Sequence, residues 1–134
     1  MPNVGLPKDC PPEEAKPKPG TYYRLAEKHH QPGEVAAKGS WLRPYRRGRW
    51  KGRLELCEAH ALSVMDDLKD ARQFREINPW AGAQALARVE IGPDDGRLLQ
   101  TPEEDCDSHH DWWTNPADLY PANNIVVEGP VEVP

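Results

Sequence analysis

The chain has 134 residues with 37% hydrophobic residues, 15 prolines and a formal net charge of −5. This length suits one domain with a single modest core. No segment approaches the roughly 18–20 consecutive apolar residues that a membrane-spanning helix needs, and the acidic balance argues against a protein that coats nucleic acid without specificity.

Residues 1–20 contain six prolines and three lysines and almost nothing to bury. This composition predicts a disordered or extended, flexible arm. Residues 21–26, Thr-Tyr-Tyr-Arg-Leu-Ala, are typical of a short aromatic-rich strand. We therefore predict a single domain over residues 21–128, preceded by the arm and followed by a tail at 129–134.

The middle of the chain contains the main predicted helix. Residues 54–64 form an apolar, strand-like stretch, and Asp66 follows as a candidate helix cap. Apolar side chains at positions 68, 71, 74 and 77 fall on one face of a helix over about 66–77. Asn78-Pro79 ends that helix, because the residue before proline avoids helical backbone angles.

The second half of the chain predicts mainly strands. Residues 86–91 alternate between apolar and charged side chains, and residues 92–96 form a turn into 97–100, so we predict a hairpin. Residues 109–113 and 125–128 are further candidate strands. Together these elements predict an α+β fold with a small, antiparallel-rich sheet and one main helix.

Two Cys-x-x-His pairs are the first candidate site. Cys57, His60, Cys106 and His109 form a formally complete set of four ligands, which is the number that structural zinc requires. The alternative is that Cys57 lies in a core strand as a small buried side chain. Three cysteines without a framework spacing, and a start that lacks a signal-peptide pattern, predict a cytoplasmic protein with reduced thiols.

Histidines, serine and tryptophans suggest a second candidate site. His60, Ser63, His109 and His110 could take part in proton transfer, because the ordinary pKa of histidine lies near neutral pH. The alternative is that His109 and His110 are hydrogen-bonded structural residues beside Trp112 and Trp113.

The segment 41–53 carries six basic side chains interleaved with aromatic ones and no acid. Such a segment can contact phosphates and stack on bases, or hold a pyrophosphate. It equally could pair with the acidic segment 103–118. The basic residues that would contact a nucleic acid or a nucleotide partner are Arg43, Arg46, Arg47, Arg49, Lys51 and Arg53.

The order of three landmarks resembles a set of small uncharacterised bacterial and phage proteins. The landmarks are Tyr23-Arg24-Leu25, a central Leu62-Ser63 turn from strand to helix, and Ser108-His109-His110-Asp111-Trp112-Trp113. The resemblance spans about residues 21–127 and implies a small bacterial or phage protein.

A strand bearing arginine, a central small polar residue and a late strand bearing glutamate are also similar to ADP-ribosyltransferase-like folds, including small toxins. That resemblance implies that Arg24 binds the pyrophosphate of NAD, that Ser63 lies at the central motif and that Glu128 is the late acid. It further implies that Tyr22 or Trp112 stacks on nicotinamide. The competing expectation is an interaction module without enzymatic activity, which binds a protein or nucleic acid through residues 41–53, with structural zinc as an option.

Overall fold

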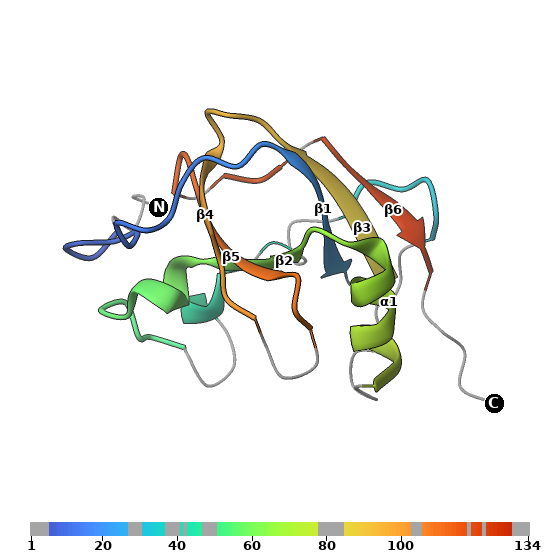
Figure 1. Cartoon of the computed structure of the whole chain (residues 1–134), viewed down its shortest axis with the longest axis horizontal. Helices are drawn as coiled ribbons and strands as arrows, with labels where there is room; N and C mark the ends of the chain where they lie inside the picture. The colour runs from blue at the N-terminus through green and yellow to red at the C-terminus, as the bar shows by residue number, and fades with distance from the viewer. Residues whose placement is uncertain are drawn as a thin grey trace.

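The computed structural model describes residues 6–26, 31–36, 41, 43–46, 51–77, 85–102, 106–117, 119–121 and 123–129. Within these residues the chain forms a six-stranded sheet and one α-helix, which confirms the predicted α+β class (Figure 1). The strands are β1 (Gly20–Ala26), β2 (Leu62–Met65), β3 (Ala85–Ile91), β4 (Gly96–Gln100), β5 (His109–Thr114) and β6 (Asn124–Glu128). The helix is α1 (Leu68–Ile77), and the 3-10 turns are η2 (Pro44–Arg46) and η4 (Cys57–His60).

All neighbouring strands are antiparallel, in the order β4-β5-β2-β1-β3-β6. β1 pairs with β3 along its whole length, from Gly20↔Ile91 to Ala26↔Ala85. Between β1 and β2, by contrast, the register consists of the single pair Tyr23↔Met65. The sheet therefore consists of two three-stranded halves that are joined narrowly at β1 and β2.

The face of the sheet opposite α1 holds the main hydrophobic core. Alternate residues of β1 point into it, and the side chains of Tyr22 and Ala26 are almost completely buried there. Trp41, from the segment between β1 and β2, is 2% exposed and packs in the same core. We call this side of the sheet the Trp41 face.

The opposite face is covered in part by α1. Leu68, Ala71 and Phe74 of the helix pack with Tyr23 and Met65 of the sheet, as the predicted helical spacing requires. The helix starts two residues later than predicted because the cap is Asp67, whose carboxylate accepts the backbone N–H of Asp70 at 3.0 Å.

The predicted hairpin of 86–91 with 97–100 is wrong. Both strands exist, but β4 pairs with β5, in a register that sets Gly96 opposite Thr114, and not with β3. Gly96 has a φ of +122°, and a Cβ there would lie 2.1 Å from the backbone oxygen of Trp113. The turn at 92–95 thus redirects the chain across the sheet instead of folding it back on β3.

Within the described residues 6–20, the N-terminal segment also differs from the prediction. Residues 6–20 are not a detached flexible arm, because Ala15 is fully buried and Lys16 forms an isolated antiparallel bridge with Leu98 of β4. Cys10 is joined to Cys57 by a disulfide bond. The prediction of reduced thiols is therefore wrong for these two cysteines, and the predicted strand-like stretch 54–64 contains the turn η4 before β2 begins.

Candidate functional site: the His110 cluster

His110 lies on β5 beside Val64 of β2, and its side chain is completely buried on the Trp41 face. Its Nδ1–H donates to the backbone oxygen of Ser108 at 2.7 Å, so that Nε2 accepts a hydrogen bond from the Lys18 ammonium at 2.9 Å. Burial, assisted by the nearby Lys18 charge, lowers the pKa of His110. The imidazole is therefore neutral, with Nδ1–H as its hydrogen-bond donor and Nε2 as its acceptor.

Tyr22 and Asp66 complete the group around His110. The Tyr22 hydroxyl donates to the backbone oxygen of Lys18 at 2.8 Å, and its ring meets His110 edge-on with centroids 5.7 Å apart. Asp66 Oδ2 lies 3.7 Å from Lys18 Nζ and 4.0 Å from His110 Nε2. Burial, and then the Asp66 charge, raise the pKa of Tyr22 to about 12. We call Lys18, Tyr22, Asp66 and His110 the His110 cluster.

The His110 cluster is buried at its histidine and tyrosine and opens to solvent at its two charged members. The side chains of Lys18 and Asp66 are 50% and 37% exposed. A ligand can therefore approach the cluster from the side of the ammonium and the carboxylate.

Arg24 lies two residues from Tyr22 along β1 and points to the same face. Its Nη1–H donates to the backbone oxygen of Ser63 at 2.8 Å, across the narrow junction of the two half-sheets. The guanidinium carbon lies 5.7 Å from the ring centroid of Trp41, a cation–π distance. Arg24 is thus 8% exposed, beneath Trp41.

The sheet divides the residues predicted for ADP-ribosyl chemistry between its two faces. Tyr22, Arg24, His110 and Trp112 share the Trp41 face. Trp112 is 1% exposed and donates its indole N–H to the backbone oxygen of Asp95 at 3.0 Å, so it is a core residue rather than an open stacking surface.

Ser63, His109 and Glu128 lie on the opposite face. The side chain of Ser63 is exposed on β2, paired across from Asp111, and only its backbone oxygen contacts Arg24. His109 is 7% exposed, with Nδ1 2.9 Å from the Thr101 hydroxyl and 3.0 Å from the Thr101 backbone oxygen. Strand alternation separates both side chains from the His110 cluster.

Glu128 does not have the environment expected of the late acid. A register shift between Leu86 and Ala87 turns Glu128 toward α1, where its carboxylate is bound by Arg72 and Arg75. The carboxylate that lies at the His110 cluster is Asp66 instead. The sequence contains a signal for this residue, because two adjacent aspartates precede the helix and only one is needed as its cap. No comparable feature of the sequence predicts a role for Lys18, which lies in a Pro/Lys-rich segment.

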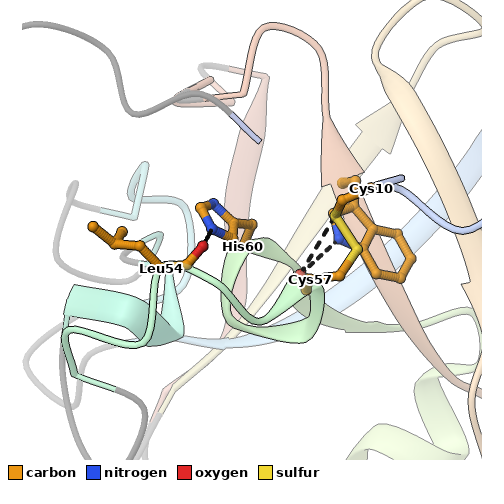
Figure 2. The surroundings of a disulfide bond; sticks show 5 residues. Cys10, Leu54, Cys57 and His60 are labelled. Atoms are coloured by element: carbon orange, nitrogen blue, oxygen red, sulfur yellow. Dashed lines mark hydrogen bonds between the residues drawn. A yellow bond between two sulfur atoms is a disulfide. The ribbon is translucent and has the colours of Figure 1, made fainter. Parts of the chain in front are cut away.

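The four predicted zinc ligands do not form a set. The sulfur of Cys57 is bonded to Cys10, and His60 Nε2 is 2.8 Å from the backbone oxygen of Leu54 (Figure 2). Cys106 is buried in another cluster, with its sulfur 3.7 Å from the Ser108 hydroxyl. No group of three or more histidine, cysteine or acidic residues suited to a metal occurs among the described residues.

The basic segment 41–53 is only partly available to a ligand. Arg43 is 6% exposed and donates to the Thr114 hydroxyl at 2.6 Å and to the backbone oxygen of Leu119 at 2.8 Å, which removes it from the predicted phosphate contacts. Arg46, Lys51 and Arg53 are exposed, whereas Arg47 and Arg49 lie outside the described residues.

A pocket of about 450 Å³ lies away from the His110 cluster, between the N-terminal segment and the ends of β4 and β5.

Comparison with protein families, with curated proteins and with solved structures found no match. In the described part of the chain, no helix combines the length and the apolar character needed to span a bilayer.

Proposed function

We propose that this chain is a small NAD-using protein with ADP-ribosyltransferase-like chemistry, and that the His110 cluster together with Arg24 is its site. The proposal rests chiefly on one observation. A carboxylate, a lysine ammonium and a neutral imidazole lie within 4.0 Å of one another, on the face of the sheet that also carries Arg24.

Asp66, Lys18 and Arg24 each have a role in the proposed reaction. When the bond between ribose C1′ and the nicotinamide nitrogen breaks, its electron pair leaves with neutral nicotinamide and positive charge develops on the ribose. The Asp66 carboxylate would stabilise that charge. Lys18 and Arg24 supply cations for the pyrophosphate, for which the arginine fork is well suited.

Arg24 is 8% exposed and its guanidinium lies against the Trp41 indole, so we expect access to Arg24 to need movement of Trp41. Lys18 and Asp66 need no such movement. We expect NAD to meet the exposed charged pair first and Arg24 only after Trp41 is displaced.

Nicotinamide release from NAD tests the proposal. We expect Asp66→Asn to lower the release rate at least about 100-fold, because a preorganised charge that stabilises a transition state is typically worth that much. Asp67→Asn is the matched control. It changes the neighbouring aspartate, keeps a residue that caps helices well, and should leave the rate within about twofold.

Two results would contradict the proposal. Wild-type protein without release above background, with and without acceptor proteins, removes the enzymatic function. Equal rates for wild type and Asp66→Asn place any activity elsewhere in the chain. Glu128→Gln serves as a second comparison, since that residue binds α1 and should retain the rate.

An interaction module that binds nucleic acid through the basic segment is the second candidate. The exposed side chains of Arg46, Lys51 and Arg53 favour this candidate. The Gly52 N–H donates to the backbone oxygen of Tyr45 at 2.8 Å, which brings these parts of the segment together. Arg53 also pairs with Glu55 at 2.7 Å, which reduces the free positive charge. Binding of a single-stranded oligonucleotide that weakens steeply with salt would support this candidate.

The source and location inferred from the sequence remain predictions. We propose a bacterial or phage protein of toxin or effector type, in the cytoplasm for at least part of its life. The disulfide bond makes its thiol state the measurement that bears most directly on location, because disulfides persist mainly in oxidising compartments.

A further inference from the structure

We propose that the Cys10–Cys57 disulfide is a redox-sensitive clasp that fastens residues 6–17 over the β4–β5 end of the sheet. We call residues 6–17 the N-terminal strap. This inference goes beyond the proposed function and does not depend on it, because its test measures structure and not NAD turnover.

The N-terminal strap has little structure of its own. Its one regular contact is the bridge in which Lys16 and Leu98 exchange two backbone hydrogen bonds of 3.0 and 2.8 Å. Ala15 packs against Ala61 and Trp113, and Leu6 and Cys10 are partly buried there. A segment with so few apolar contacts opens locally at low free energy unless a covalent bond holds it.

Cys57, by contrast, is fixed to the body of the protein. It begins η4, and its backbone oxygen accepts the indole N–H of Trp113 at 2.9 Å. Figure 2 shows the sulfur–sulfur bond between Cys57 and Cys10. The disulfide therefore joins a weakly held segment to a firmly held one, which is the arrangement of a clasp.

The pocket of about 450 Å³ depends on the clasp. Leu6, Pro11 and Pro17 of the N-terminal strap form one wall, and Arg97 and Trp113 lie in the wall contributed by the sheet. Release of the N-terminal strap would open the pocket on one side. It would also uncover the β4 backbone at Leu98, which Lys16 now pairs.

A dithiol reductant would open the clasp. One thiolate of the reductant attacks a cysteine sulfur, and the resulting mixed disulfide is resolved by the second thiol. The dithiol loses two electrons and becomes a disulfide, while Cys10 and Cys57 each gain a hydrogen as thiols. Both cysteines are partly exposed, so a small reductant reaches them, whereas Cys106 is buried in a different cluster.

Hydrogen exchange on the purified full chain, with and without dithiothreitol, tests the clasp. We expect reduction to speed exchange of the Ala15 and Lys16 amides at least about tenfold, to near the rate of an unstructured peptide. Amides paired between β1 and β3 should stay protected, at least about 100-fold slower than such a peptide. Cys10→Ser without reductant should reproduce the reduced pattern. Cys106→Ala is the matched control, and it should behave as wild type in both states.

Three outcomes would overturn the proposal. Three titratable thiols in the untreated, denatured protein would show that the disulfide is absent. Unchanged exchange after complete reduction would show that packing alone holds the N-terminal strap. Loss of protection in the β1–β3 amides together with Ala15 and Lys16 would show that reduction unfolds the whole domain instead of releasing the N-terminal strap.

Discussion

His110 is a buried imidazole whose two ring nitrogens have different partners. One donates to the Ser108 backbone oxygen and the other accepts from Lys18, so a second ring proton would face the lysine ammonium directly. Burial is the largest cause of its lowered pKa, and the Ser108 hydrogen bond and the Asp66 charge oppose the shift. The arrangement favours the neutral ring.

This lowered pKa predicts a pH dependence of stability. The unfolded chain has an ordinary histidine pKa of about 6.5 and binds a proton below it, while the folded chain resists that proton. The stabilisation is therefore complete above about pH 6.5 and is lost as the pH falls toward the folded pKa. We expect the melting temperature to fall from pH 7 to pH 5, and to fall less steeply in His110→Gln.

Thermal melts followed by circular dichroism at pH 5, 6 and 7 measure this effect. If the melting temperature of His110→Gln fell with pH as steeply as that of wild type, the pH dependence would not come from His110.

The roles of the two adjacent aspartates before α1 were only partly predictable from the sequence. A cap was predictable, because an aspartate before an apolar helical repeat satisfies free N–H groups. Which aspartate takes that role was not, because the choice depends on where β2 ends. Asp67 bonds the Asp70 N–H, and Asp66 faces Lys18 and His110.

At the scale of elements, an ion pair connects α1 to the last strand. Arg75 of α1 has 6% of its side chain exposed and donates to Glu128 at 2.6 Å and to the backbone oxygen of Gly129 at 3.1 Å. Arg72 binds the other carboxylate oxygen of Glu128. These bonds connect the helix, which packs on β1 and β2, to β6 at the edge of the sheet.

We expect Glu128→Gln to lower the free energy of unfolding by about 2 kcal/mol, because it weakens charge-assisted hydrogen bonds to a buried guanidinium. Glu90→Gln is the control. Glu90 lies at the surface, 3.9 Å from Arg88, and accepts a hydrogen bond from the Thr21 hydroxyl at 2.8 Å that a glutamine oxygen can still accept, so the change should cost less than about 0.5 kcal/mol. Urea unfolding measures both. Similar losses in the two variants would show that Glu128 contributes no more than a surface charge.

Strands and helix were predictable where the side-chain pattern has a clear period. Residues 86–91 alternate and positions 68, 71, 74 and 77 have helical spacing, and the structure confirms β3 and α1 there. The order in which the strands pair in the sheet was not predictable, because it depends on contacts between segments that are distant in the sequence. The turn at 92–95 therefore predicted a hairpin that does not form, and strand alternation placed Ser63 and Arg24 on opposite faces.

At the scale of the whole molecule, the disulfide connects the beginning of the chain to its middle. Cys10 and Cys57 are 47 positions apart. A cross-link of that span restricts the unfolded chain and, in the chain-entropy model, stabilises the fold by about 4 kcal/mol.

We therefore expect Cys10→Ser to lower the free energy of unfolding by up to about 4 kcal/mol relative to oxidised wild type. Dithiothreitol should remove most of this difference by reducing the wild-type bond. Denaturant titrations of both proteins, with and without the reductant, give the comparison. A variant as stable as oxidised wild type would show that the cross-link does not restrict the unfolded chain.

The strand order also determines how this chain reaches its fold. Tyr23 of the first strand pairs with Arg88, and Arg88 in turn pairs with Ile125 near the end of the chain. The β1-β3-β6 half of the sheet therefore cannot form until residues 124–128 have been synthesised. Such distant pairings close long loops before they gain stabilising contacts, so folding belongs to the slow, millisecond-to-second range of small β-rich domains.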